Sequence, residues 1–435
     1  MIELIPIGGY KEIGRNCIAV KIDDEVVILD LGLQLDRYIA YTEDEDNINV
    51  SAKSLIEIGA VPDVNHISDL RSKVVGICIS HAHLDHVGAV PFLASKFDCP
   101  IYATPFTIEV INALTADKDV ALPNELVRKD INSRFRISEH IEGEFISMTH
   151  SVPETVVIVL HTPYGQVVYA NDFKFDNAPT LGSKPNYARL RQLKPHVLIM
   201  DSLYALNFAK TPSETIAREM LRDVVYGVET KGKAIIITTF SSHIARLKSI
   251  LEIGEHLNRK VVFVGRSLER YVTAAEAVGI ASFTDKVEII KYRSQIQRYF
   301  KRLKDPQNHV FVVTGHQGEP KAALARLADG MFPFGEEDIV VFSCNVIPVL
   351  GNIENRHKLE AALVAKKCRL FKDIHVSGHG SREDQRDMIN LLKPTYFVPT
   401  HGELRMLESV KELALQMGYD ESKVLILDNG QRVRV

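Results

Sequence analysis

The sequence predicts an α/β protein with more than one domain. Its 435 residues are more than one ordinary hydrophobic core accommodates. Up to Asp201, short runs rich in Val and Ile alternate with polar turns, which is typical of β-strands. After Asp201, similar runs alternate with amphipathic helical stretches, and this rhythm is typical of a parallel α/β unit.

Each element is predicted from the length of an apolar run, from its content of β-branched residues and from the polar or turn residues that bound it. Predicted strands of the first part are 25–30, 74–80, 156–160, 166–170 and 196–201; those of the second part are 234–240, 260–264, 309–314 and 339–343; the end of the chain returns to short strands at 369–376, 396–400 and 424–427. A helix is predicted within 211–226, with Ser213 as its N-cap. The short acidic segment 43–47 is interpreted as a solvated loop.

Composition limits the classes of function. The formal net charge of −4 argues against a protein that coats nucleic acid non-specifically, so any such binding needs a local basic channel. The basic stretch 291–304 could line an RNA path, or it is the solvated face of an amphipathic helix. No apolar run reaches the ~18 residues that span a bilayer, and the N-terminus has no secretory pattern. We therefore expect no membrane association.

The cysteines indicate the redox environment of the chain. They are five in number, widely scattered and without a CxxC pair, at Cys17, Cys78, Cys99, Cys344 and Cys368. A disulfide framework or a Cys-ligated zinc site is therefore not expected, and a reduced cytoplasm fits the sequence best.

The segment 80–86, which reads SHAHLDH, carries the strongest chemical signal. It places three imidazoles and a carboxylate within six residues, directly after a predicted strand. Such groups resist burial without partners, and nitrogen and oxygen ligands at this density suit Zn²⁺. Asp85 and His86 are expected to open a helix over 87–96, so their side chains would point differently from those of His81 and His83. One stretch of chain could then serve two metal ions.

A two-metal site needs further ligands. His150 ends a strand-like run, and Asp172 follows the predicted strand 166–170. A carboxylate can bridge two cations about 3.5–4 Å apart, which a single imidazole cannot. His379 and His401 each precede a Gly near a strand end, which is either an active-site position or a simple turn.

With these motifs in hand, the chain resembles the metallo-β-lactamase superfamily, more narrowly its β-CASP nucleases, and most closely the ribonuclease J family in its shorter archaeal form. The resemblance extends over nearly the whole chain. It rests on GGYKEIGRN at 8–16, Asp30 in VVILDLG, SHAHLDHVGAVP, NDFKFD, Ser241-Ser242-His243, GHQGEP at 315–320, HVSGHGS and PTHGE. His316 and the stretch 342–352 depart from the usual family pattern.

The resemblance implies a layout and a set of roles. A metallo-β-lactamase αββα sandwich would comprise 1–205 and 366–435, with a β-CASP α/β domain inserted at 206–365 and the substrate threading the cleft between them. His81, His83 and His150 would hold one zinc, Asp85, His86 and His401 the other, and Asp172 would bridge the two zinc ions. Asp30 would orient the ligands from behind.

The resemblance also implies the chemistry. Asp201, His379 and His401 match the three β-CASP motifs, and a His at the third favours RNA over DNA. The metal pair would activate water, and His379, held by Asp201, would protonate the leaving 3′ oxygen. The family implies a 5′→3′ exoribonuclease that prefers 5′-monophosphate ends. The expected phosphate-binding residues are Ser241, Ser242, His243, His375, Ser377 and Gly378.

Alternative functions stay open from the sequence. One is an endoribonuclease of the 3′-end-processing type, and another is a metallo-β-lactamase-fold hydrolase acting on a thioester or lactam. The latter gives no reason for an inserted domain or for Asp201, His379 and His401 together. A di-iron redox protein of this fold would carry Glu where His83 stands, and a decayed scaffold would have lost ligands. The partner is expected to be single-stranded RNA, and the sequence is compatible with a homodimer.

Overall fold

The chain forms two compact units. The computed structural model describes residues 1–43, 50–347 and 350–435. The first unit comprises 1–177, 183–211 and 378–435, and the second comprises 178–182 and 212–377. The acidic residues 44–47 and positions 348–349 of the stretch 342–352 lie outside the described residues. The domain limits predicted at 205/206 and 365/366 stay a prediction.

The first unit contains two β-sheets. The strand order of the seven-stranded sheet is β19 (Val433–Arg434), β1 (Ile2–Gly8), β2 (Cys17–Ile22), β3 (Glu25–Leu29), β4 (Val74–Cys78), β5 (Ile101–Ala103) and β6 (Leu126–Arg128). The order of the six-stranded sheet is β18 (Tyr396–Thr400), β11 (Pro195–Asp201), β10 (Gly165–Ala170), β9 (Val156–Thr162), β8 (Glu142–Ser147) and β7 (Ser133–Arg136). Strand β11 pairs in parallel with both β10 and β18, so segments far apart in sequence end side by side.

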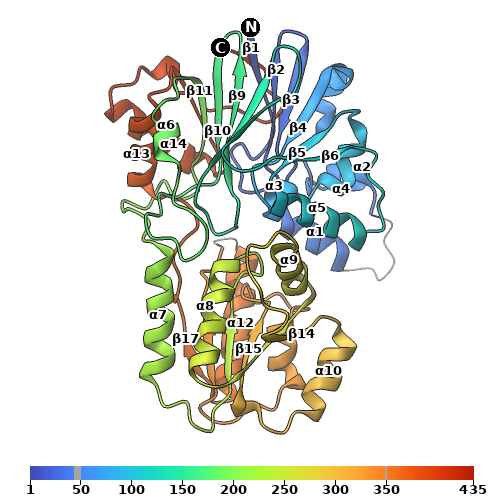
Figure 1. Ribbon diagram of the computed structural model, residues 1–435, viewed down its shortest axis with the longest axis vertical. Coiled ribbons are helices and arrows are strands. Elements are labelled where there is room, and N and C mark those ends of the chain that lie inside the picture. Colours follow the sequence, from blue (N-terminus) through green and yellow to red (C-terminus); the bar gives the residue numbers. More distant parts are fainter. Residues whose placement is uncertain (44–49, 348–349) are drawn as a thin grey trace. The chain divides into compact units, whose positions relative to one another are not determined.

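The two sheets enclose the core of this unit. Alternate side chains of β1, β2, β3, β9, β10 and β11 pack into one buried apolar cluster between them. The opposite face of the six-stranded sheet is covered by α6 (Tyr187–Leu190), α13 (Arg382–Leu392) and α14 (Leu404–Gln416). Helices α1 (Leu35–Glu43), α2 (Ala52–Glu57), α3 (Leu84–Val87), α4 (Val90–Leu93) and α5 (Pro105–Asp117) lie beside the other sheet (Figure 1). The predicted αββα sandwich is confirmed.

The second unit is a parallel α/β structure, as predicted. Its six strands follow the order β14 (Val287–Ile290), β13 (Lys260–Val264), β15 (His309–Val313), β12 (Ile235–Thr238), β16 (Ile339–Phe342) and β17 (Arg369–Phe371). All five pairings are parallel. Its helices are α7 (Glu214–Gly227), α8 (Ile244–His256), α9 (Arg266–Ala277), α10 (Arg293–Arg302), α11 (Ala323–Arg326) and α12 (Leu350–Ala365). Ser213 caps α7 by accepting from the amide of Thr215, which confirms that prediction.

Two local predictions were wrong. The strand expected at 424–427 is a single bridge between Val424 and Phe397, because this segment buries apolar side chains without running alongside a partner strand. The helix expected over 87–96 is two short helices with a break at 88–89, and it begins earlier, at Leu84. Pro91 explains the break, because it has no amide hydrogen to donate to the carbonyl of Val87.

Other features of the chain bear on its environment. All five cysteines are free thiols. No helix within the described ranges combines the length and the apolar character needed to cross a lipid bilayer.

The core between the two sheets predicts a graded response to truncation. Leu160 in β9 is fully buried in it, whereas Leu415 in α14 is 39% exposed. Leu160→Ala is expected to lower the free energy of unfolding of the first unit by ~2–5 kcal/mol, because a cavity remains where the side chain was. Denaturant titration with Leu415→Ala as the control, expected to lose less than ~1 kcal/mol, checks this. Equal losses for the two variants would contradict the assignment of the core.

Candidate metal centre

The chemically active side chains of the first unit follow the ends of strands. His81 and His83 come after β4, His150 after β8, Asp172 after β10 and His401 after β18. Their strands belong to both sheets, so the two halves of the sandwich contribute to one place. Loops at strand ends allow close approach of polar groups without interrupting the hydrogen-bonded ladder.

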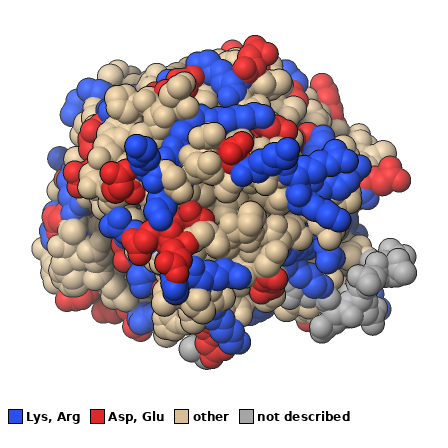
Figure 2. All heavy atoms as spheres, turned by 90° about the horizontal axis from the view of Figure 1, so that it is seen from below, with Lys and Arg blue, Asp and Glu red and all other residues tan. Residues whose placement is uncertain are grey.

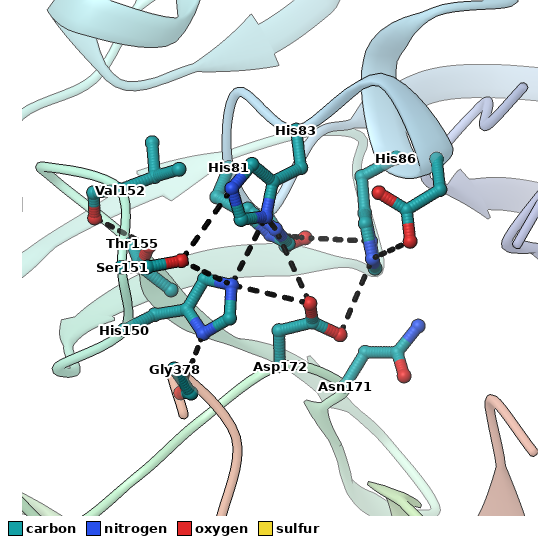
Figure 3. A network of polar contacts seen from close by, with 12 residues as sticks. His81, His83, His86, His150, Ser151, Val152, Thr155, Asn171, Asp172 and Gly378 are labelled. Atoms are coloured by element: carbon teal, nitrogen blue, oxygen red, sulfur yellow. Dashed lines mark hydrogen bonds and ion pairs between the residues drawn. The ribbon is translucent and has the colours of Figure 1, made fainter. Parts of the chain in front are cut away.

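Four of the predicted ligands form a first cluster (Figure 3). Nδ1 of His83 lies 3.2 Å from Nε2 of His81 and 3.0 Å from Nε2 of His150. Oδ2 of Asp172 lies 3.4 Å from Nε2 of His81 and 3.3 Å from Nε2 of His150. One ligand atom from each residue therefore faces a common centre.

Three further predicted ligands form a second cluster beside the first. Nε2 of His86 lies 3.6 Å from Oδ2 of Asp85, and Nε2 of His401 lies 3.7 Å from the same oxygen. The other oxygen of Asp172, Oδ1, lies 3.2 Å from Nε2 of His86 and 3.9 Å from Nε2 of His401. Asp172 thus presents one oxygen to each cluster.

The residues fit a pair of divalent cations. Both carboxylate oxygens of Asp172 are buried and, within the described part of the chain, accept no hydrogen bond. The Nδ1 atoms of His86 and His150 are occupied by Asp30 and by the carbonyl of Gly378, each at 2.7 Å. In the neutral rings the Nε2 atoms therefore present lone pairs to the carboxylate, and two acceptors face each other unless a ring takes up a second proton or a cation binds. Cations between them remove this conflict, and His and Asp are ligands that Zn²⁺ accepts.

Burial favours the neutral form of three of the clustered histidines. Desolvation holds the pKa of His81, His83 and His150 well below the usual range, so these rings are uncharged at neutral pH, the form that can bind a cation. Burial also disfavours the charged form of His86 and Asp172. The neighbouring opposite charges outweigh it, raising the pKa of His86 well above its usual value and lowering that of Asp172. These groups are electrostatically interdependent.

The carboxylate of Asp30 contacts three residues in or beside the clusters. It accepts from the amide and hydroxyl of Ser80, at 2.7 and 2.8 Å, and from the hydroxyl of Tyr169 at 2.9 Å. Its Oδ2 also lies within hydrogen-bond distance of Nδ1 of His86, at 2.7 Å. The carboxylate is fully buried, so these contacts fix the ring of His86 and the start of the SHAHLDH segment.

Backbone strain accompanies two of these positions. Asp30 and His401 have φ values of 61° and 54°, in the left-handed region that residues with a Cβ rarely adopt. The amide of His401 donates to the carbonyl of Gly9 at 2.7 Å, which holds the strained turn. Gly378 is required for a different reason, because a Cβ there would lie 2.9 Å from Cε1 of His150.

His379 lies beside the two clusters. Its Nδ1 donates to Oδ2 of Asp201 at 2.7 Å, and its Nε2 lies 3.7 Å from Oδ2 of Asp172. Its ring stacks with those of His401 and Tyr204, with centroids 5.6 and 5.8 Å away. Burial works against its charged form, but Asp172 and Asp201 raise the pKa of His379 to about 9. The ring is fixed, and Nε2 points toward the clusters.

The predicted phosphate-binding residues divide between the two units. Ser241, Ser242, His243, His375 and Ser377 belong to the second unit, and Gly378 to the first. Of these, His243 is buried, caps α8 by accepting from the amide of Arg246, and lies 3.3 Å from Glu214. His375 lies beside Phe240. Binding of phosphate by these residues stays a prediction.

Sequence reasoning missed several residues around the clusters. Tyr169 donates to Asp30, Nδ2 of Asn16 lies 3.1 Å from Nε2 of His86, and Tyr204 stacks on His379. Tyr169 and Tyr204 carried no local signal, because a tyrosine at a strand or turn is ordinary. Asn16 belongs to the GGYKEIGRN motif, and this motif could have indicated that Asn16 lies near the site.

Together, the αββα sandwich and the His/Asp clusters at its strand ends define a metal-dependent hydrolase. Comparison with known proteins narrows the class. The model of the metallo-beta-lactamase superfamily matches residues 11–225, that of the ribonuclease J beta-CASP domain 232–360, and that of the Zn-dependent metallo-hydrolase RNA specificity domain 364–425. The chain belongs to the ribonuclease J family of β-CASP metallo-β-lactamase proteins, as the sequence predicted.

Individual relatives are similar to this chain over nearly their full length. Ribonuclease J of Pyrococcus abyssi is 41% identical over 445 residues, covering 100% of this chain and 97% of the relative. Ribonuclease J of Methanocaldococcus jannaschii is 39% identical, with 99% and 98% covered. A solved structure of a protein of unknown function from Enterococcus faecalis V583 has a TM-score of 0.67 at 17% identity, covering 99% of each chain, and shares the fold.

The contacts of Asp30 predict an effect on metal affinity. Asp30→Asn puts an amide nitrogen where one of two accepting oxygens stood, so Ser80 and His86 lose part of their support. The affinity for Zn²⁺, measured by competition with a chelating dye, is expected to fall ~10–100-fold. Tyr169→Phe removes a single donor to the same carboxylate and serves as the milder control. Parental affinity in Asp30→Asn would contradict the supporting role.

Proposed function

We propose that this chain is a two-zinc exoribonuclease that degrades single-stranded RNA in the 5′→3′ direction, preferring 5′-monophosphate ends. Membership of the ribonuclease J family makes it a metal-dependent ribonuclease. The observation that carries the proposal is the pair of clusters that share Asp172, one oxygen facing each. A shared carboxylate of this kind is typical of sites that hold two cations close together.

The proposed ligand sets are those that the family resemblance implies. His81, His83 and His150 would hold one zinc ion, Asp85, His86 and His401 the other, and Asp172 would contribute to both. When bound, the metal pair supplies an activated water at neutral pH and neutralises charge on the phosphate. The protein's own groups would hold the ligand side chains in place and donate a proton to the leaving group.

His379 is the proposed proton donor to the departing 3′ oxygen. Its Nδ1 is engaged by Asp201, so a proton given to the substrate would come from Nε2. Part of the raised pKa comes from Asp172, whose charge bound metal ions would share. The Asp201 carboxylate, fully buried against Nδ1, remains as the partner that favours the protonated ring.

The remaining parts of the proposal concern substrate and setting. Ser241, Ser242, His243, His375, Ser377 and Gly378 are proposed to grip RNA phosphates through hydroxyl, imidazole and backbone groups. The division into 1–205, 206–365 and 366–435 is retained as the proposed domain scheme. A cytoplasmic location is proposed from the five free thiols, and a homodimer is compatible with the proposal.

The role of His379 predicts a separation of rate from metal content. His379→Ala is expected to lower kcat for RNA cleavage by ~10²–10⁴-fold, the usual contribution of a general acid. Zinc content, measured by elemental analysis, is expected to stay near two ions per chain. Cleavage at the parental rate would remove His379 from the mechanism.

A ligand variant provides the contrast. His401→Ala is expected to lose both activity and one zinc ion, because His401 belongs to the second cluster. Full retention of both ions would refute its assignment as a ligand. If the parental protein bound no stoichiometric metal even after incubation with zinc, the two-zinc proposal would fail.

Direction and end preference are tested with one RNA in two forms. The 5′-monophosphate form is expected to yield a ladder of mononucleotides from its 5′ end, and the 5′-triphosphate form little product. The reason is that the residues proposed to grip phosphates would hold a single terminal phosphate group. Discrete internal fragments from both forms would instead identify an endoribonuclease. Cleavage of a lactam or thioester with no cleavage of RNA would identify another hydrolase of this fold.

A further inference from the structure

Helix α10 carries an unusual concentration of positive charge. Four of its ten residues are cations, and Arg293, Arg298, Lys301 and Arg302 are all exposed. Lys304, also exposed, follows the helix. These five residues form what we call the α10 basic face. The opposite side of the helix buries Ile296 and Phe300 in the core of the second unit, so the face is held in place.

The cations of this face lack acidic partners. Among the described residues, no carboxylate oxygen lies within 4.0 Å of the charged nitrogens of Arg293, Arg298, Lys301, Arg302 or Lys304. Neighbouring cations of the same unit are paired: Lys291 with Glu269 at 2.8 Å and Lys286 with Glu255 at 3.1 Å. The basic face therefore keeps an uncompensated positive potential on a chain whose net charge is −4.

Two further observations support that potential. Burial and the charge of Arg293 together lower the pKa of Arg326, so cations crowd one another here. Figure 2 shows a group of Lys and Arg side chains on the right of the face seen from below, the side on which α10 lies in Figure 1. Proteins that need only solubility disperse such charges among acidic ones.

A cleft beside the helix offers room for a bound group. It has a volume of about 600 Å³ and is lined by Arg298, Arg302 and Lys304 together with Tyr299 and the carboxylates of Glu288 and Asp305. Glu288 pairs with Lys260 at 2.5 Å, and this contact partly neutralises it. Tyr292, at the start of α10, is 50% exposed and available for stacking on a base. Cations with an aromatic at their border are the composition of surfaces that hold single-stranded nucleic acid.

We propose that the α10 basic face binds the phosphate backbone of single-stranded RNA, as a contact additional to the metal centre. The inference rests on the proposed function in taking RNA as the substrate. Three of its five cations are Arg, whose planar guanidinium can engage a phosphate through two hydrogen bonds. The contact is independent of sequence, because backbone phosphates are the same at every nucleotide. Each phosphate that the face engages adds to the affinity by releasing bound counterions from the RNA.

The test removes charge from the face and measures binding without cleavage. Arg298→Gln, Lys301→Gln and Arg302→Gln are combined in one variant. The matched control combines Lys231→Gln, Lys248→Gln and Lys358→Gln, three exposed cations dispersed over the same unit. Binding of a long, fluorescent phosphorothioate RNA, which resists hydrolysis, is followed by anisotropy over a series of salt concentrations.

The triple variant is expected to bind at least ~10-fold more weakly, with a slope of log K against log salt shallower by about 2. That slope follows from three lost phosphate contacts at about 0.7 each on a single strand. The control is expected to stay within about twofold of the parent in affinity, because its cations do not form one surface. Retention of binding by Arg298→Lys with Arg302→Lys would show that charge, not packing, is required.

Failure of this inference is distinguishable from failure of the proposed function. Parental affinity and slope in the triple variant would overturn the α10 site and leave the ribonuclease intact. Polyglutamate is added as a competitor of the RNA. If the parent binds this acidic polypeptide at the face in preference to RNA, the site belongs to a protein partner and the inference falls. A parent that binds RNA through α10 but cleaves none would sink the proposed function alone.

Discussion

The structure of the first unit depends on one electrostatic constraint, the buried carboxylate of Asp172. Neither of its oxygens accepts a hydrogen bond from the described residues, and each faces imidazole nitrogens at 3.2–3.9 Å. In a low-dielectric interior an uncompensated carboxylate costs several kcal/mol, so such an arrangement persists only if a cation or protons occupy it. The surrounding fold favours the cation, because burial keeps His81, His83 and His150 neutral. The same constraint explains the hydrogen bonds of Nδ1 of His86 with Asp30 and of Nδ1 of His150 with the carbonyl of Gly378, which turn Nε2 of both rings toward the carboxylate.

The constraint also explains where strain is tolerated. Asp30 and His401 adopt positive φ values, which residues with a Cβ rarely do. Both follow strands, β3 and β18, whose ladders bear no strain and are buried on both faces. The sandwich therefore holds the turn residues in conformations they would not choose alone, and the cost is offset by burial in the two apolar layers. Rigid sheets with irregular ends are a way to bring seven side chains from distant segments together.

The sequence predicted what is encoded locally and missed what depends on tertiary neighbours. The β-branched runs identified most strands, and the density of His and Asp in 80–86 indicated a metal site because no core packing explains it. The helix after that segment was misjudged because Pro91 acts on Val87, a relation visible in the sequence but outweighed by the apolar pattern. The prediction of a strand at 424–427 was wrong because an apolar run indicates that a segment is buried, not that it pairs with another strand. The stacking of Tyr204 on His379 could not be predicted, since the two residues lie far apart in the chain.

Charge is used in two different ways in this chain. At the metal centre the charges are buried, so their interactions are strong and little affected by salt. On α10 the charges are exposed, and each is worth little alone; only their grouping without acidic partners gives a surface that can hold a polyanion. A net charge of −4 makes this grouping matter, because the chain as a whole repels RNA while one helix attracts it. Affinity for single-stranded RNA can then arise without any base-specific contact, because the backbone phosphates that this face would hold are the same at every nucleotide.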